Sequence, residues 1–264
     1  MRALIDYFTP HTKEGICMAF SGGVDSSLLL AAACWAVKET RATKPVLAVT
    51  FETRLHPHGD TAEAKALALT LGAKHQIIKV DEFSDSRILH NPKNRCYLCK
   101  SLLFQSLLQA GKNAGYTFFC EGSNVDDTKV YRPGLQAVRE AGVYSPLIDC
   151  HLTKAQIRRL SAEAGLPTAG KPSTPCMATR LPYDTPFDYA LLDTIHRGEE
   201  WLRGLGFYNV RLRFHQPILR IEIDTKDFNH FMNQHEAITR AMKDLGFKYI
   251  TLDLEGFRSG SMDV

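Results

Sequence analysis

The chain has 264 residues, of which 44% are hydrophobic and 23% are charged, and its formal net charge is +3. These values are typical of a globular protein with one large domain or two smaller ones. No apolar run is long enough to span a bilayer, and the first residues lack the pattern of a secretory signal. The charge is also too small for a typical nucleic-acid binder. We therefore expect a cytoplasmic protein that binds neither membranes nor nucleic acid.

The first half of the chain alternates strands and helices. Strands are predicted at 16–20, 46–51, 76–80 and 116–120, and helices at 26–37, 60–71 and 153–165. Gly72 stands where a glycine ends a helix, and Thr153 stands where a threonine caps one. Strands that alternate with helices pair in parallel through right-handed crossovers. The sequence therefore predicts an α/β domain with a doubly wound parallel sheet over residues 1–170.

The second half differs from the first in composition and in its pattern of helices and strands. Four prolines fall within residues 171–186, so neither a helix nor a central strand is expected there. Beyond this segment the patterns predict a helix at 187–205, strands at 209–214 and 218–224, a helical stretch at 227–245 and a strand at 249–254. We expect a proline-rich linker at 171–186 that carries Cys176, followed by a small α+β domain at 187–264.

The sequence SGGVDSS at residues 21–27 joins the first strand to the first helix. Glycines let backbone amides approach phosphate oxygens, and a helix N-terminus favours an anion. The string is not a Walker loop, because no Gly-Lys-Ser/Thr follows, and it resembles the loop of the N-type ATP pyrophosphatases. The predicted ATP contacts are Ser21, Gly22, Gly23, Asp25, Ser26 and Ser27, with Asp25 also a ligand of Mg²⁺. The alternative is a tight turn without a ligand.

A second polar segment, EGSNVDD at residues 121–127, follows the fourth predicted strand. Ligands bind at the carboxyl edge of open parallel sheets, where this segment would lie. We predict that Asn124 and Asp127 belong to the ATP site. The alternative is an acidic turn.

Two of the seven cysteines, Cys96 and Cys99, form a C-x-x-C pair that opens a helical pattern. A helix N-terminus and the neighbouring Arg95 and Lys100 favour thiolates. The pair is open to several interpretations: a redox dithiol, half a zinc site, two ligands of an iron–sulfur cluster, or coincidence. No second C-x-x-C completes a zinc ribbon.

Cys176 lies in the linker, where Lys171 and Arg180 favour its thiolate. Three thiolates can bind three irons of a four-iron cluster and leave one iron open to an exogenous sulfide. The alternative is that Cys176 acts alone as a sulfur donor while the pair is structural.

The phosphate loop and three further segments together strongly resemble the LarE family of ATP-dependent sulfur transferases. These segments are 91–100 (NPxxRCxxCK), 131–137 (YRPGLQA) and 171–180 (KPSxxCxxxR). The family matures the nickel-pincer nucleotide cofactor of lactate racemase. The resemblance implies an enzyme that adenylylates a carboxylate of pyridinium-3,5-biscarboxylic acid mononucleotide, releases pyrophosphate and delivers sulfur to form a thiocarboxylate. It also implies a homo-oligomer that draws on a sulfide source.

The family has two kinds of sulfur donor. One kind sacrifices a single cysteine, at the position of Cys176, and leaves dehydroalanine. The other has three cysteines, which match Cys96, Cys99 and Cys176, and holds a 4Fe–4S cluster that relays sulfide. Because this sequence has all three, we predict the cluster kind, with ATP, Mg²⁺ and a 4Fe–4S cluster as cofactors. The predicted catalytic residues are Cys176, Cys96, Cys99 and Asp25.

A substrate site is predicted in the second half. Along the strand at 209–215, the period of two places Val210, Leu212 and Phe214 inward and Arg211, Arg213 and His215 outward. Two arginines on one face suit a nucleotide phosphate, and the alternative is a solvated face with cross-strand ion pairs. With the resemblance, the predicted substrate contacts are Tyr97, Arg180, Glu199, Arg211 and Arg213. Tyr97 stands where many family members have tryptophan.

Two rival functions use the same motifs. A tRNA thiolase also combines such a loop with cysteines, but the weak charge and the absence of a basic, aromatic-rich stretch argue against it. A nucleotide-binding redox sensor is disfavoured by the acidic segment at 121–127 and by Cys176 between prolines.

Overall fold

The computed structural model describes residues 1–56, 60–172 and 176–258, so residues 173–175 of the predicted linker lie outside the described residues. The chain divides into two compact units. The first comprises Met1–Thr53, His58–Ile88 and Asn94–Ser173, and the second Arg54–Pro57, Leu89–Lys93 and Thr174–Val264. The sequence did not predict that segments 54–57 and 89–93 would join the second unit. The division at residues 170 and 187 into functional domains stays a prediction.

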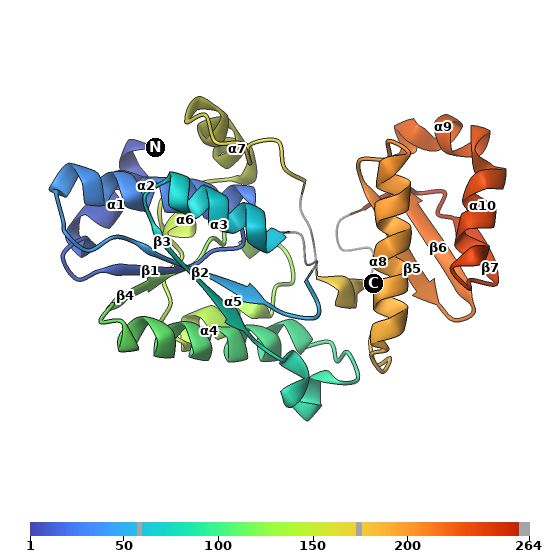
Figure 1. Cartoon of the computed structure of the whole chain (residues 1–264), viewed down its shortest axis with the longest axis horizontal. Helices are drawn as coiled ribbons and strands as arrows, with labels where there is room; N and C mark the ends of the chain where they lie inside the picture. Colours follow the sequence, from blue (N-terminus) through green and yellow to red (C-terminus); the bar gives the residue numbers. More distant parts are fainter. Residues whose placement is uncertain (57–59, 173–175, 259–264) are drawn as a thin grey trace. The chain divides into compact units, whose positions relative to one another are not determined.

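The first unit is built on a sheet of four parallel strands (Figure 1). These are β1 (Ile16–Ala19), β2 (Leu47–Glu52), β3 (Lys74–Lys79) and β4 (Phe118–Cys120), in the order β3-β2-β1-β4. The central strand β1 pairs on both sides, with Cys17 opposite Leu47 of β2 and Phe119 of β4. All four strands coincide with predicted ones to within a few residues, and the parallel α/β fold is confirmed.

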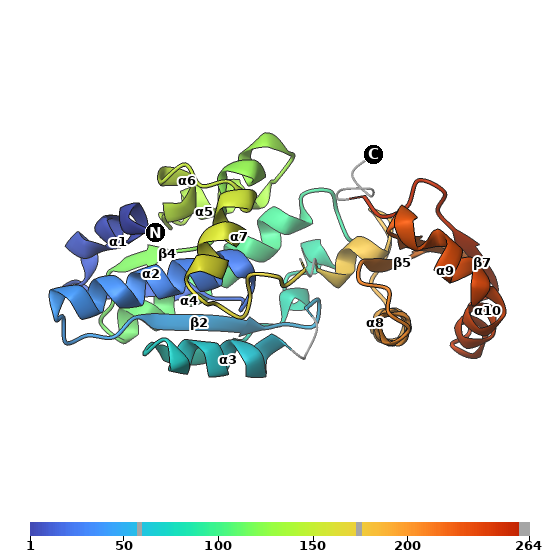
Figure 2. The ribbon, with the colours of Figure 1, turned by 90° about the horizontal axis from the view of Figure 1, so that it is seen from above.

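Helices cover both faces of this sheet (Figures 1 and 2). They are α1 (Arg2–Phe8), α2 (Val24–Thr40), α3 (Asp60–Thr70), α4 (Arg95–Asn113), α5 (Gly134–Glu140), α6 (Pro146–Asp149) and α7 (Lys154–Glu163). Short 3₁₀ turns are η1 (Thr9–His11), η2 (Glu82–Ser84), η3 (Ser86–Ile88) and η4 (Val125–Lys129). Because side chains alternate along β1, Met18 packs with α1, α2 and α3, whereas Cys17 packs with α4 and α5. Helices α1, α5 and α6 were not predicted.

Local signals explain where the predicted helices begin and end. Thr153 caps α7 through a capping box, in which its hydroxyl accepts from the backbone of Gln156 and the Gln156 side chain accepts from the backbone of Thr153. Gly72 follows α3 with a φ of +83°, as expected of a glycine that ends a helix. Helix α2 is buried on nearly all sides, because it lies between the sheet and helices α1 and α7.

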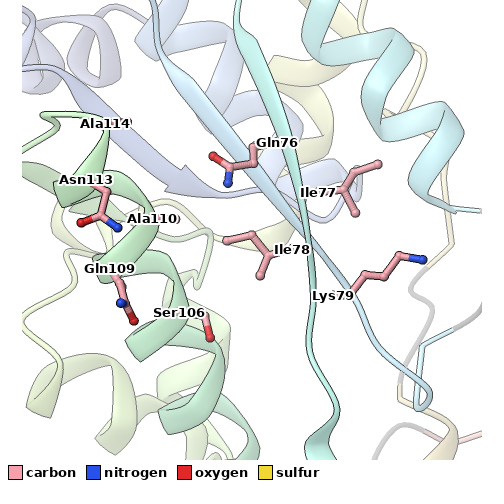
Figure 3. A pocket seen from close by; sticks show the side chains of 9 residues that line it. All are labelled: Gln76, Ile77, Ile78, Lys79, Ser106, Gln109, Ala110, Asn113 and Ala114. Carbon is pink, nitrogen blue, oxygen red and sulfur yellow. The ribbon is translucent and has the colours of Figure 1, made fainter.

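Strand β3 is one edge of the sheet, and a groove of about 690 Å³ lies between it and α4. Figure 3 shows Gln76 and Ile78 on the side of β3 that faces α4, with Ile77 and Lys79 on the other side. None of the predicted site residues lines this groove.

The second unit has a mixed sheet of three strands, β5 (Val210–His215), β6 (Ile218–Ile223) and β7 (Tyr249–Leu252), in that order. Strands β5 and β6 are antiparallel, and β6 and β7 are parallel. The helices are α8 (Tyr189–Gly204), α9 (Phe228–Asn233) and α10 (His235–Asp244), with 3₁₀ turns η5 (Met177–Arg180) and η6 (Thr225–Asp227). The predicted small α+β architecture is thus confirmed.

Two details of the second unit differ from the prediction. The helical stretch expected at 227–245 is interrupted at Gln234, between α9 and α10. The proline-rich segment contains the turn η5, which is short enough to fit between its prolines. Leu212 points into the core, as the predicted period of two along β5 requires. It lies against Gly198 of α8, as does Met242 of α10.

Within the part of the chain that the structure describes, no helix is both long and apolar enough to cross a membrane.

Candidate active site

The loop at residues 21–27 leads from β1 into α2. Gly22 has a φ of +71°, and a Cβ atom at this position would lie 3.0 Å from the Cβ of Ala64. Both facts require glycine. Helix α2 begins at Val24, and the first amides of a helix have no partner within it. They therefore form a site for an anion at the carboxyl edge of the sheet.

The three serines of this loop differ in position. The hydroxyls of Ser21 and Ser26 lie 3.1 Å apart, and that of Ser26 donates to the Gly23 carbonyl. Ser27 is fully buried, and its backbone amide donates to the same carbonyl of Gly23. As a correction, the Ser27 hydroxyl does not face solvent as a phosphate ligand would, because the helix turns this side chain into the core.

Asp25 lies in the first turn of α2 and has two partners. Its Oδ2 forms an ion pair with Nζ of Lys154, and its Oδ1 accepts from Nδ2 of Asn124 at 3.4 Å. The predicted loop and the predicted segment 121–127 are thus brought together. Sequence reasoning missed Lys154, although its position directly after the cap Thr153 marks the start of a helix at the same edge.

The segment after β4 contacts the loop backbone to backbone. A Cβ at Gly122 would lie 3.2 Å from the backbone nitrogen of Ser26, so a glycine is needed for this approach. Asn124 and Asp127 form the capping box of η4, in which Asn124 accepts from the Asp126 amide and Asp127 accepts from the Asn124 amide. Asp127 also pairs with Arg132 at 2.9 Å. Asp127 therefore stabilises the conformation of segment 121–127, and it is half-buried.

Glu121 is a buried residue of this region that was not predicted as a site residue. Its carboxylate accepts from the amide and hydroxyl of Ser123 and from the hydroxyl of Ser145. Nζ of Lys100 lies 3.6 Å from the same carboxylate. Lys100 is therefore directed to Glu121, and the predicted effect of this lysine on the cysteine pair is not what the structure shows.

The first-unit edge has the chemistry that Mg²⁺ and a triphosphate require. The Asp25 carboxylate offers oxygen ligands, the start of α2 offers amide donors, and Lys154 offers a cation. The residues present therefore fit the nucleotide and metal that the loop predicts.

The cysteine pair lies in the first turn of α4, with Cys96 exposed and Cys99 buried. Nη2 of the buried Arg95 donates to Sγ of Cys96 at 3.1 Å. The Tyr97 hydroxyl donates to Glu140 at 2.6 Å, and this hydrogen bond raises the pKa of Tyr97 and lowers the pKa of Glu140. The hydroxyl of Tyr97, the predicted aromatic contact of the substrate, is thus hydrogen-bonded to a residue of the first unit.

Cys176 belongs to the second unit, where it is half-buried and directly precedes the turn η5. The three predicted cluster ligands are therefore divided between the two units. Within each unit, the described residues bring together no group of three or more His, Cys, Asp or Glu side chains that could hold a metal ion.

Buried charge pairs dominate the predicted substrate face of the second unit. The guanidinium of Arg180 binds Glu199 through two hydrogen bonds of 2.7 and 2.8 Å, and both side chains are 1% exposed. Arg213 binds Glu222 in the same forked way, at 3.1 and 3.0 Å. The predicted outward orientation of this face is wrong, because Arg213 also donates to the Thr179 carbonyl, so η5 covers the strand.

Two pKa values reflect this crowding. Burial alone would raise the pKa of Glu199, but its bonds to Arg180 outweigh burial and hold the pKa below the usual 4.5. Burial, reinforced by the nearby cations Arg180, Arg203 and Arg213, lowers the pKa of Arg211 to about 10. Arg211 also lies over the ring of Phe257.

Comparison with solved structures shows the class of fold. The chain matches an NMN synthetase from Francisella tularensis with a TM-score of 0.52 and 17% identity, over 66% of this chain and 73% of that one. This likeness, with the strand order and the glycine loop, defines an α/β protein of the N-type ATP pyrophosphatase fold. No model of a known protein family matches the chain.

Curated relatives show the family. A pyridinium-3,5-bisthiocarboxylic acid mononucleotide synthase from Lactiplantibacillus plantarum is 35% identical over 95% of this chain and 89% of its own length. An uncharacterized protein from Synechocystis is 34% identical over 93% of this chain and 91% of its own length. The chain belongs to the LarE family of ATP-dependent sulfur transferases.

The buried pair in the second unit leads to a prediction about stability. Replacing Glu199 by Gln leaves Arg180 buried without a counter-charge, so we expect the unfolding free energy at pH 7 to fall by about 3 kcal/mol. Because the folded-state pKa of Glu199 is lowered, its stabilisation is complete above about pH 4.5 and is lost as pH falls through the folded value. The difference between wild type and variant should therefore shrink below about pH 4.5.

Urea unfolding checks this prediction through Trp201 of α8, in a Trp35→Phe background that removes the other tryptophan of the chain. Glu200→Gln is the matched control, because Glu200 is the next residue and its side chain is 57% exposed. Equal losses in the two variants would contradict the assignment of the buried pair.

The ion pair at Asp25 leads to a second prediction. Lys154→Ala removes the cation that pairs with Asp25 beside the anion site, so we expect binding of Mg·ATP to weaken on the order of tenfold, as for the loss of one charge-assisted hydrogen bond. Isothermal titration calorimetry measures the affinity. Lys129→Ala serves as the control, since that lysine is exposed and pairs with Asp126. Unchanged affinity for Mg·ATP in Lys154→Ala would show that Lys154 does not contribute to nucleotide binding.

Proposed function

We propose that this enzyme adenylylates a carboxylate of pyridinium-3,5-biscarboxylic acid mononucleotide and delivers sulfur to it, forming a thiocarboxylate for the nickel-pincer nucleotide cofactor. The observation that carries the proposal is the 35% identity, over 95% of the chain, to a relative named as the synthase of the bisthiocarboxylic acid mononucleotide. The contact between the glycine loop and Asp25, Asn124 and Lys154 supports it.

The first step makes the carboxylate reactive. A carboxylate oxygen attacks the α-phosphorus of ATP, the bond from that phosphorus to the bridging oxygen breaks, and pyrophosphate leaves with the electron pair. We propose that Asp25 holds Mg²⁺, that the amides at the start of α2 and the residues Ser21 and Ser26 bind the phosphates, and that Lys154 stabilises the developing charge. Asn124 and Asp127 hold the neighbouring segment in place.

The second step forms the carbon–sulfur bond. A sulfur nucleophile attacks the acyl carbon, and AMP leaves with the electrons of the acyl–oxygen bond, which gives the thiocarboxylate. We propose that Cys96, Cys99 and Cys176 hold a 4Fe–4S cluster, which would supply the sulfide when bound. The three thiols suit this cluster, because such clusters are held by cysteine sulfurs, and Arg95 donates a hydrogen bond to Sγ of Cys96.

The substrate phosphate is proposed to bind in the second unit. Three arginines (Arg180, Arg211 and Arg213) and two glutamates (Glu199 and Glu222) are buried among the side chains described there. Burial, reinforced by neighbouring cations, lowers the pKa of Arg211 to about 10. A phosphate bound beside these arginines would orient the pyridinium ring, with Tyr97 as a further proposed contact.

The proposal includes three broader statements. Cys96, Cys99 and Cys176 form no disulfide in the described part of the chain, which suits a reducing compartment and supports a cytoplasmic location. A separate sulfide source must renew the sulfur after each transfer. A homo-oligomer follows from the family resemblance. The sequence patterns support a division into a nucleotide domain (1–170), a linker (171–186) and a substrate domain (187–264).

Isotope exchange between ATP and pyrophosphate tests the substrate. We expect exchange with pyridinium-3,5-biscarboxylic acid mononucleotide and none with bulk tRNA, because the net charge is small. Asp25→Ala should abolish exchange, whereas Cys176→Ala should leave exchange intact and stop thiocarboxylate formation. Cys150→Ala, at another half-buried free cysteine, is the control. Exchange only with tRNA, or its loss in Cys176→Ala, would overturn the proposed function.

The cluster has its own test. After anaerobic purification and reconstitution, we expect about four irons and four sulfides per chain, in line with a 4Fe–4S cluster. Loss of any of Cys96, Cys99 or Cys176 should lower this content, whereas Cys150→Ala should not. A colourless protein without iron, whose mass falls by one sulfur at Cys176 after turnover, would instead establish the sacrificial route.

A further inference from the structure

The turn that follows Cys176 is held by segments from much earlier in the chain. The amide of Met177 donates to the carbonyl of Leu55, and the amide of Asp184 donates to the carbonyl of Asn91. Both partners belong to the short segments, 54–57 and 89–93, that join the second unit. The conformation around Cys176 therefore depends on residues more than eighty positions away in sequence.

Asn91 makes the most concentrated of these contacts. Its Nδ2 donates to three backbone carbonyl oxygens, of Ala178 at 3.3 Å, Leu181 at 3.2 Å and Pro182 at 2.9 Å. An amide nitrogen has two hydrogens, so at least one of them is shared. All three partners are acceptors, so the nitrogen of the carboxamide, and not its oxygen, must face the turn.

The backbone of Asn91 is held in an uncommon conformation. Its φ is +50°, and the next residue is Pro92, which normally forces its predecessor into an extended conformation. Asparagine tolerates a positive φ better than most residues do. The side chain is 1% exposed, so the strain is maintained by the contacts with the turn rather than by solvent.

The other side of the turn is held by charged groups. Arg180, fixed by Glu199, donates through Nη1 to the carbonyl of Cys176 at 3.4 Å, and the Thr179 hydroxyl donates to the same oxygen at 2.9 Å. Cys176 is thus fixed at its own carbonyl, and the residue as a whole is half-buried. Asn91 and the Arg180–Glu199 pair hold the turn between them.

We infer that Asn91 is a positioning residue for sulfur delivery, because its carboxamide holds the turn that sets the orientation and exposure of the Cys176 thiol. Only four residues of chain separate Asn91 from Cys96, so the same short segment leads into the helix of the cysteine pair. The role in sulfur delivery rests on the proposed function, whereas the effect on the Cys176 thiol does not.

Alkylation of Cys176 by iodoacetamide, followed by peptide mass spectrometry, tests the inference on the full-length chain without reconstituted iron. Asn91→Gly removes the carboxamide and still permits a positive φ. The loss of these hydrogen bonds should free the turn and speed alkylation of Cys176 about tenfold, equivalent to about 1.4 kcal/mol. Asn94→Gly is the matched control, because Asn94 is exposed and its side chain caps nothing at the start of α4.

Activity provides the second readout. We expect Asn91→Gly to keep ATP–pyrophosphate exchange within about twofold of wild type while kcat for thiocarboxylate formation falls about tenfold. Asn91→Asp, which keeps the shape but presents a carboxylate to the carbonyls, should act in the same direction and decides the matter if Asn91→Gly does not fold.

The outcomes separate the inference from the proposed function. Alkylation of Cys176 at the wild-type rate in a folded Asn91 variant would overturn the inference, whatever the substrate. Absence of exchange in the wild-type protein would defeat the proposed function, and faster alkylation in the variant would still support the positioning of Cys176. If exchange and thiocarboxylate formation fall equally in the variant, Asn91 has only a general structural role. That result would overturn the inference that Asn91 acts in sulfur delivery.

Discussion

The parallel hydrogen bonds that join β1 to β2 on one side and to β4 on the other are the constraint from which the first-unit site follows. Parallel strands end at the same edge of a sheet, so the loop after β1 and the segment after β4 must meet there. Gly122 contacts Ser26, and Asn124 contacts Asp25, because of this register. Helix α7 then brings Lys154 to the same carboxylate.

The second unit depends on buried charge rather than on strand register. Burying Arg180 and Glu199 is costly unless each satisfies the other, and their forked pairing does so. Because Arg180 is four residues from Cys176, this pair also fixes the cysteine-bearing turn. Asn91 completes the restraint from the opposite side with neutral donors. The turn η5 thereby holds the backbone of Cys176 in a defined conformation.

Prediction succeeded where a residue's surroundings are set by its near neighbours. The strands, the capping box at Thr153 and the glycine after α3 all follow from local patterns of hydrophobicity and capping. It failed for α1, α5 and α6, which are short and whose stability comes from packing against neighbouring helices. It also failed for the outward face of β5. The period of two correctly grouped Arg211 with Arg213, but a pattern does not show that another segment, here η5, covers that face.

The sequence by itself determined the parallel α/β fold, the glycine loop and the three cysteines that place the chain among the sulfur transferases. Glycine conformations, helix caps and strand periods are local properties, so the order of residues is enough to specify them. Only the tertiary structure decided that Lys154 pairs with Asp25, that Ser27 is turned into the core, and that Asn91 holds the turn after Cys176. The residues in these contacts are up to 129 positions apart in sequence. They come within hydrogen-bonding distance only because the chain between them folds, and a local sequence pattern does not show that.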